Sequence, residues 1–126
     1  PTEREARYSL FEQDLPVRPL LGKLLKKSKA KNVILKLGSR GLMSLNDKSN
    51  DYVALDPFVN NLVDSNGAGD ALLAYSGASL YVTNSLIISS IIGILAASCK
   101  CESEGNKPVK KKDIEKKIDE IDQILN

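Results

Sequence analysis

The chain has 126 residues with 18 basic and 16 acidic side chains, so its formal net charge is only +2. Because it lacks both a basic excess and the Arg-dense, aromatic-interleaved stretches usual in nucleic-acid binders, we expect no nucleic-acid partner. The absence of histidine and the presence of only two cysteines exclude a zinc site and histidine-based triads, which leaves carboxylate, Lys, Tyr or Cys for acid–base chemistry.

The first half of the chain predicts two helices followed by three strands. Residues 3–11 form a charged, helix-favouring segment, and apolar residues recur at helical spacing over 16–29, with Pro16 in the first turn. The run 33–37 is short, largely apolar and β-branched, and it stops at Gly38, which is typical of a buried strand. Residues 42–45 and 52–55 predict two further strands, joined by the polar hairpin 46–50.

The second half predicts three helices, over 68–82, 85–99 and 111–125, with Asn84 or Ser85 as the cap of the middle one. The apolar run 86–99 falls short of the roughly 20 residues that span a bilayer, so we expect a buried helix and no membrane span. The last helix is amphipathic, and its predicted apolar face consists of Ile114, Ile118, Ile121 and Leu125.

The order of these elements, with strands early and helices late, suits the closing half of an α/β domain better than a complete doubly wound sheet. At this length we expect one folding unit with its own core and no second domain of usual size. The chain enters a charged helical segment directly after Pro1, so we expect it to be a piece of a longer protein. No secretory leader precedes that segment, and a cytoplasmic location is expected.

The segment 63–71, Val-Asp-Ser-Asn-Gly-Ala-Gly-Asp-Ala, is the most informative part of the sequence. Small residues at the start of a helix let the backbone approach a ligand, and the unpaired N–H groups of the first turn favour an anion such as phosphate. Asp70 stands beside this position, where its carboxylate can accept the proton of an attacking hydroxyl. Taken alone, the same residues also fit a plain helix start, capped by Ser65 or Asn66.

The longer pattern adds a family resemblance. Residues 64–70, Asp-Ser-Asn-Gly-Ala-Gly-Asp, resemble the second signature of the ribokinase-like (PfkB-type) carbohydrate kinases, which ends in the catalytic base. Three further segments are similar to motifs of this family in the same order: 1–6 (Pro-Thr-Glu-Arg-Glu-Ala), 36–41 (Lys-Leu-Gly-Ser-Arg-Gly) and 104–108 (Glu-Gly-Asn-Lys-Pro). Two positions depart from the pattern, because Thr2 stands where Asn is usual and Asn106 where a small residue is usual.

The resemblance implies a ribokinase-like three-layer α/β/α fold, of which residues 1–126 would be the C-terminal, ATP-binding and catalytic portion. It implies ATP-dependent phosphoryl transfer to a hydroxyl of a sugar or sugar-like small molecule. The expected cofactors are ATP and Mg²⁺, with K⁺ as a candidate third. A homodimer is a candidate state of the full-length protein. We expect the isolated portion to be inactive, because the family's acceptor-binding residues lie in an N-terminal half.

The resemblance also implies a role for each matching residue. Asp70 is the expected catalytic base, Glu5 is expected to help organise Mg²⁺ indirectly, and Asp64 is the candidate ligand of a monovalent cation. The expected anion hole consists of Asn66, Gly67, Ala68 and Gly69. Nucleotide contacts are expected from Lys36, Gly38, Ser39, Gly41, Gly105 and Asn106.

Two other classes of nucleotide site do not fit the sequence. No Gly-x-x-x-x-Gly-Lys-Ser/Thr segment follows a strand, and Gly67 and Gly69 lack the further glycine of a dinucleotide fingerprint. One open alternative is a non-catalytic nucleotide- or phosphate-binding module, which would have no use for a carboxylate at Asp70. Another is a kinase of the same fold acting on a nucleoside, a vitamin precursor or a heptose phosphate. Cys99 is expected to fill a core position rather than act as a nucleophile.

Overall fold

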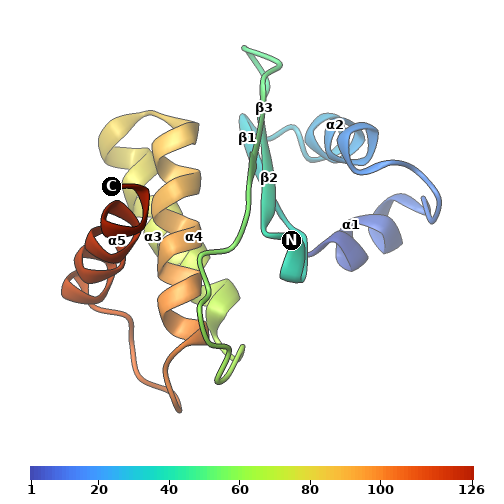
Figure 1. The fold of residues 1–126 in the computed structure, drawn as a ribbon. Helices are drawn as coiled ribbons and strands as arrows, with labels where there is room; N and C mark the ends of the chain where they lie inside the picture. Colours follow the sequence, from blue (N-terminus) through green and yellow to red (C-terminus); the bar gives the residue numbers. More distant parts are fainter. The chain divides into compact units, whose positions relative to one another are not determined.

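The computed structural model describes residues 1–126, and their contacts group them into two units, Pro1–Asp56 and Pro57–Asn126. All strands belong to the first unit, whereas the regular structure of the second unit is helical (Figure 1). The predicted order of two helices, three strands and three further helices is therefore confirmed. Each unit has its own hydrophobic core.

The first unit contains an antiparallel sheet in the order β1-β2-β3. Its strands are β1 (Asn32–Lys36), β2 (Leu42–Asn46) and β3 (Tyr52–Leu55). Leu35 pairs with Met43 across β1 and β2, and Leu42 pairs with Leu55 across β2 and β3. The turn between β2 and β3 is closed by the side chain of Asn46, which accepts hydrogen bonds from two backbone N–H groups that follow it. All three predicted strands are confirmed, with shifts of one residue at some ends.

Two helices, α1 (Glu3–Leu10) and α2 (Val17–Ser28), lie on the same side of this sheet (Figure 1). Side chains alternate along β1, so Val33 and Leu35 are buried while their neighbours are only half-buried. The core of the first unit consists of Ala6, Leu20, Leu21, Leu25, Val33, Leu35 and Leu45. The apolar spacing of α2 thus predicts its buried face.

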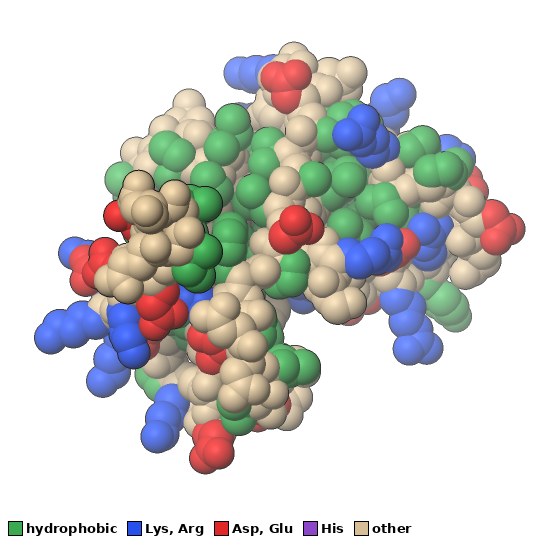
Figure 2. All heavy atoms as spheres, in the orientation of Figure 1, with side chains coloured by type: hydrophobic (Ala, Val, Ile, Leu, Met, Phe, Trp, Pro, Cys, Tyr) green, Lys and Arg blue, Asp and Glu red, His purple; other side chains and the backbone are tan.

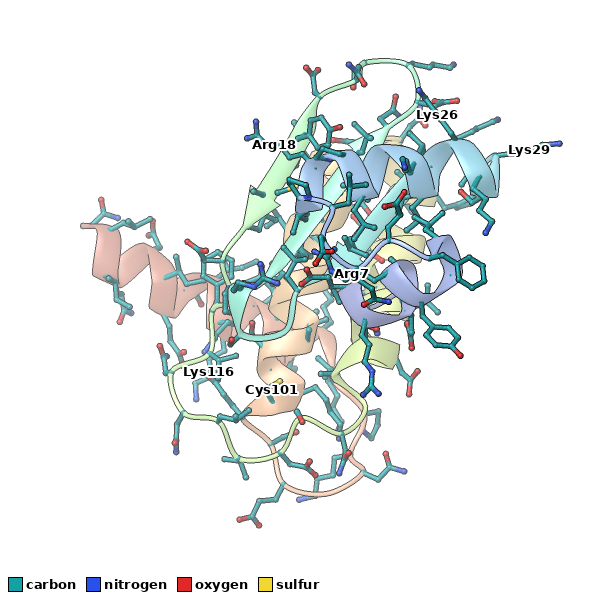
Figure 3. All side chains as sticks on the ribbon, turned by 90° about the vertical axis from the view of Figure 1, so that its right-hand side faces the viewer. Arg7, Arg18, Lys26, Lys29, Cys101 and Lys116 are labelled. Atoms are coloured by element: carbon teal, nitrogen blue, oxygen red, sulfur yellow. The ribbon has the colours of Figure 1, made fainter.

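The connection between α1 and α2 is fixed by Arg7. Its guanidinium pairs with Glu3 one turn earlier and donates to the backbone carbonyls of Gln13 (2.9 Å) and Leu15 (2.8 Å). Figure 3 shows this side chain next to the loop that it holds. A guanidinium suits this task because it offers five donors in one rigid plane. The first helix is thereby held in place.

The second unit consists of α3 (Ala68–Thr83), α4 (Leu86–Cys101) and α5 (Lys111–Leu125). Helices α3 and α4 lie side by side (Figure 1) and approach closely through small residues. A methyl group at Gly93 would stand only 2.9 Å from Cβ of Ser76, and the Ser89 hydroxyl donates to the Ser76 carbonyl at 2.7 Å. The Ser85 hydroxyl accepts a bond from the Ile88 N–H, which confirms one of the two predicted caps of α4.

Residues of helix α4 from Ser89 onward are buried or half-buried, but Ile87 and Ile88 in its first turn are exposed. The prediction of a buried helix therefore holds for most of its length. No helix of this structure combines the length and the apolar character needed to cross a membrane.

The apolar face predicted for α5 is only partly correct. Ile114 is buried against Leu95 and Ala96, but Ile118 is 43% exposed and Leu125 is 80% exposed. The buried face instead contains Lys117, which is 3% exposed. The remaining face of α5 is charged, and Figure 2 shows basic and acidic side chains interspersed on its visible surface.

Burial of Lys117 is possible because its ammonium contacts both carboxylate oxygens of Glu102, at 2.6 and 2.7 Å. A paired lysine can occupy a position that the hydrophobic pattern assigns to an isoleucine. Burial alone would raise the pKa of the Glu102 carboxyl. The hydrogen bonds from Lys117 and from the backbone N–H of Asn60 outweigh that effect and hold this pKa below its usual value.

Candidate active site

The turn before α3 is shaped by its own first residue. The Asp64 carboxylate accepts a bond from the Asn66 N–H at 2.9 Å, and the Ala68 N–H donates to the Ser65 carbonyl at 3.2 Å. Between them Gly67 adopts a left-handed conformation with φ of 78°, which a residue with a side chain adopts only with strain. Asp64 therefore folds the turn, and Gly67 is required at its tightest point.

This turn leaves the start of α3 without a cap. No side chain accepts a bond from the first turn, and the earliest helical bond runs from the Ala71 N–H to the Gly67 carbonyl. The N–H groups of Gly67, Gly69 and Asp70 consequently have no acceptor in the protein. Unpaired donors at the positive end of a helix attract an anion. The alternative in which Ser65 or Asn66 caps this helix with its side chain is therefore wrong.

Asp70 is the third residue of α3, and its side chain is exposed. Its carboxylate makes no hydrogen bond or ion pair, so both oxygens are available to a ligand or to an incoming proton. The free N–H groups and the free carboxylate lie within one helical turn. This segment therefore offers an anion site and a proton acceptor next to each other.

The turn is joined to the end of α4 by backbone bonds. The N–H groups of Val63 and Asp64 both donate to the carbonyl of Cys101, at 2.8 and 3.0 Å. Cys101 belongs to the last turn of α4 (Figure 3). The segment that leads into the candidate anion site is thus fixed to helix α4 by backbone hydrogen bonds.

Lys100, the neighbour of Cys101, contacts both candidate segments of the second unit. Its ammonium donates to the carbonyls of Gly105 (2.5 Å) and Lys107 (3.1 Å), and its side chain is close enough to Gly67 that a methyl group there would stand 3.0 Å from Cε. Gly105 and Gly67 therefore both lie next to one lysine side chain. Gly105 has φ of 70° and, like Asn106, is exposed.

Lys100 is a residue that the sequence analysis missed. The available signal was its position, because it follows the buried residues Gly93 and Ala96 at helical spacing and therefore falls on their face of α4. A lysine at the end of a helix is usually solvent-exposed and complements the helix dipole. For this reason the burial of Lys100 was not predicted.

The remaining predicted nucleotide contacts lie in the first unit, at the end of β1. Lys36 is the last residue of β1, and its N–H donates to the Pro1 carbonyl at 2.9 Å. Gly38 and Ser39 are exposed in a short 3₁₀ turn, whereas Gly41 is buried. A methyl group at Gly41 would stand 1.9 Å from the Leu55 carbonyl oxygen. The geometry gives Gly41 a packing role, while Gly38 and Ser39 are open to a ligand.

Glu5 takes part in a capping box at the start of α1. Its carboxylate accepts the Thr2 N–H at 2.8 Å, and the Thr2 hydroxyl accepts the Glu5 N–H at 3.2 Å. The bond from the Thr2 backbone lowers the pKa of the Glu5 carboxyl, and the nearby charge of Lys36 lowers it further. An exposed, ionised carboxylate with one oxygen free fits an indirect contact to Mg²⁺, because this ion keeps several of its water ligands.

Neither cysteine has the character of a nucleophile. Burial raises the pKa of the Cys99 thiol to about 11, and burial also raises the pKa of Cys101. The thiolate, which is the reactive form, is therefore scarce at neutral pH. This finding agrees with the packing role predicted for Cys99. No group of three or more His, Cys, Asp or Glu side chains is arranged to hold a metal ion.

One hollow of the second unit, about 640 Å³, lies between α5 and the segment before it. Its lining includes Cys99, Glu102, Lys107, Asp113 and Lys117. None of the residues predicted for the site lines this hollow. The candidate site is therefore a surface turn with free donors rather than a closed cavity.

The comparisons with known proteins agree with the motifs. Residues 1–112 match the sequence model of the pfkB family of carbohydrate kinases, and the chain belongs to this family. A search of curated proteins found no match.

Solved structures of similar fold come from the same group of kinases. A ribokinase from Thermotoga maritima is 25% identical with a TM-score of 0.81, and the match covers 94% of this chain and 41% of the ribokinase. Phosphofructokinase-2 from Escherichia coli, solved in complex with potassium, is 20% identical with a TM-score of 0.84 over 97% of this chain and 40% of its own. A ribokinase from Arabidopsis thaliana, complexed with ribose and ATP, is 22% identical with a TM-score of 0.80 over 94% and 39%.

These matches confirm the α/β, ribokinase-like fold class. The chain spans about 40% of the length of the solved structures that it resembles.

Proposed function

We propose that this chain is the nucleotide-binding and catalytic portion of an ATP-dependent kinase that phosphorylates a hydroxyl of a sugar or sugar-like molecule. The observation that carries the proposal is the start of α3, where three N–H groups lack acceptors and the Asp70 carboxylate lacks partners. Membership of the pfkB family supports the reaction class. The acceptor class is supported by the similar ribokinase that was solved with ribose and ATP.

In the proposed reaction the acceptor hydroxyl oxygen attacks the γ-phosphorus of ATP, and the bond from that phosphorus to the β–γ bridging oxygen breaks to release ADP. The hydroxyl proton passes to the Asp70 carboxylate. The N–H groups of Gly67 and Gly69 stabilise the negative charge on the transferred phosphoryl group. Mg²⁺, when bound with ATP, neutralises phosphate charge, and Glu5 is the residue proposed to hold its hydration shell.

Two site proposals concern the nucleotide. Lys36, Gly38 and Ser39 at the end of β1 are proposed as nucleotide contacts, and Gly105 and Asn106 are proposed as nucleotide contacts as well. For Gly38 and Ser39 the support is exposure just after a strand end, and for half-buried Lys36 it is the position at the strand end itself. For Gly105 and Asn106 it is the link through Lys100 to the turn at Gly67.

Replacement of Asp70 tests the proposal in the full-length kinase that contains these residues. Asp70→Asn keeps the size of the side chain and removes the proton acceptor, so kcat should fall by about 10²- to 10⁴-fold with little change in the KM for ATP. Asp51→Asn is the matched control, because Asp51 is also an exposed aspartate and should leave both parameters unchanged. Gly69→Val places a branched side chain at the phosphate and should weaken ATP binding as well.

The same experiment separates the kinase from a non-catalytic phosphate-binding module. A binding module would bind ATP in the unmodified protein without turnover, and Asp70→Asn would only strengthen binding by removing a repulsive charge. A kcat for Asp70→Asn within about threefold of the unmodified enzyme lies far below the general-base range and would remove the catalytic role of Asp70.

A further inference from the structure

Lys100 is an unusual residue for the interior of a helical unit. It is 5% exposed and has no carboxylate partner among the salt bridges. Its ammonium donates instead to two backbone carbonyls, those of Gly105 at 2.5 Å and Lys107 at 3.1 Å. A buried charge is costly unless it is bound, so these carbonyls must be held in position around it. The arrangement is a small cation-binding site whose cation is part of the chain.

This site adjoins the candidate anion hole. A methyl group at Gly67 would stand 3.0 Å from Cε of Lys100, so the end of the lysine side chain packs beneath the turn that carries the free N–H groups. The same turn is tied to the carbonyl of Cys101, the next residue of α4. A positive charge at this depth acts on a phosphate through little intervening water and is weakly screened by salt.

The residues here do not fit a separate monovalent cation. The E. coli phosphofructokinase-2 of similar fold was solved with potassium, and the sequence resemblance makes Asp64 the candidate ligand of such an ion. In this chain the Gly105 carbonyl is bonded to an ammonium, and the Asp64 carboxylate is bonded to the Asn66 N–H. A second positive ion on the same carbonyls would be repelled by Lys100.

We propose that the ammonium of Lys100 takes the place of a monovalent cation, and that phosphoryl transfer by this protein does not depend on K⁺. This inference rests on the proposed function. Lys100 acts as a positioning residue, because it holds the segment 105–107 to the turn at Gly67 and places a fixed charge behind the anion hole. Asp64 then folds the turn and binds no metal.

The first test needs no variant. Initial rates of the full-length kinase are measured with ATP, Mg²⁺ and its acceptor in KCl and in choline chloride of equal ionic strength, and the thermal unfolding midpoint is measured in both salts. We expect rates that agree within about twofold and equal midpoints, since no site for K⁺ remains. A rate that rises about tenfold or more in KCl, equivalent to about 1.4 kcal/mol, would overturn the proposal.

The second test removes the built-in cation. Lys100→Ala should lower the rate in choline chloride by about tenfold or more, and KCl or ammonium chloride should restore much of that loss by filling the freed carbonyls. Its unfolding midpoint should also rise in KCl relative to choline chloride. Lys117→Ala is the matched control, because Lys117 is equally buried but paired with Glu102, and its loss should reduce stability without creating a response to K⁺.

The two arms separate this inference from the proposed function. If the unmodified protein shows no kinase activity, the response of the Lys100→Ala midpoint to KCl still tests the cation role of Lys100. A Lys100→Ala variant that folds and shows no response to KCl or ammonium in either measurement would contradict the proposal. A variant whose loss is equal to that of Lys117→Ala in both salts would reduce Lys100 to a packing role and also contradict it.

Discussion

Two glycines with a positive φ, one in each unit, lie in turns with opposite consequences. In the strand-end turn of the first unit, Gly41 has φ of 79°, its N–H donates to Gly38 and its carbonyl accepts from Leu37. In the helix-start turn of the second unit, Gly67 has φ of 78° and its N–H has no acceptor. Left-handed glycine therefore does not identify a binding site.

The two turns differ in whether their backbone N–H groups have acceptors within the protein. At Gly41 the backbone groups are satisfied within the protein, and the missing side chain makes room for the Leu55 carbonyl. At Gly67 the neighbouring donors remain free, and the missing side chain faces only the flexible end of Lys100. The first turn serves packing, and the second is the one that we propose binds a ligand.

The largest loss of stability is expected from a substitution in the strand-end turn. Gly41→Ala would place a methyl group 1.9 Å from the Leu55 carbonyl oxygen, a distance that only a backbone shift can relieve. We expect the free energy of unfolding of the first unit to fall by about 3 kcal/mol or more. Urea unfolding of the full-length protein measures this loss. A decrease below about 1 kcal/mol would show that Gly41 is not needed for packing.

The next effect concerns the ion pair of the second unit. Glu102→Ala would leave the ammonium of Lys117 buried without its partner, which should cost about 3 kcal/mol. The unmodified protein should also lose stability in acid, where Glu102 becomes protonated. The pKa of Glu102 is lowered in the folded state, so its contribution is present above the unfolded value of about 4.3 and disappears as the pH falls through the folded pKa.

Urea unfolding between about pH 6 and about pH 3 measures that contribution. Glu102→Gln should flatten the dependence of stability on pH over this range, because the variant has no carboxyl to protonate. An unchanged pH dependence in Glu102→Gln would show that other carboxylates account for the acid sensitivity.

The smallest expected effect on stability comes from the helix-start turn. Gly67→Ala imposes a left-handed conformation on alanine, at about 1–2 kcal/mol, and Lys100 can shift to relieve the contact. Affinity for ATP should fall together with stability, because the free N–H groups change direction. Ser85→Ala removes the cap of α4 for a similar loss of about 1 kcal/mol. This control should leave ATP affinity unchanged, and equal affinities of both variants would contradict a ligand role for the turn at Gly67.

Most elements of both units could be predicted from the sequence because their signals are local. Helical spacing located α2 and α4, and short apolar runs located the three strands. The candidate site was found through a continuous seven-residue motif, which needs no tertiary information. The acceptor, the oligomeric state and the assignment of 1–126 to the C-terminal portion of a kinase stay predictions.

The parts that sequence could not supply depend on contacts between distant residues. Burial of Lys117 needs Glu102, and burial of Lys100 needs the carbonyls of Gly105 and Lys107. Lysine is rarely buried, so neither lysine was predicted to lie in a core, and the apolar pattern of α5 placed Ile118 there instead. The packing role of Gly41 likewise depends on Leu55 in the neighbouring part of the sheet.

The central claim, that the turn at Gly67 binds phosphate through free N–H groups, is tested most directly by amide NMR. Spectra of the full-length protein are compared in ATP and in adenosine, so that shifts caused by the phosphates are isolated from shifts caused by the base. We predict phosphate-dependent shifts at Gly67, Gly69 and Asp70 and none at Gly41, whose N–H is bonded to Gly38. Unaltered resonances from Gly67 to Asp70 in millimolar ATP would contradict the account.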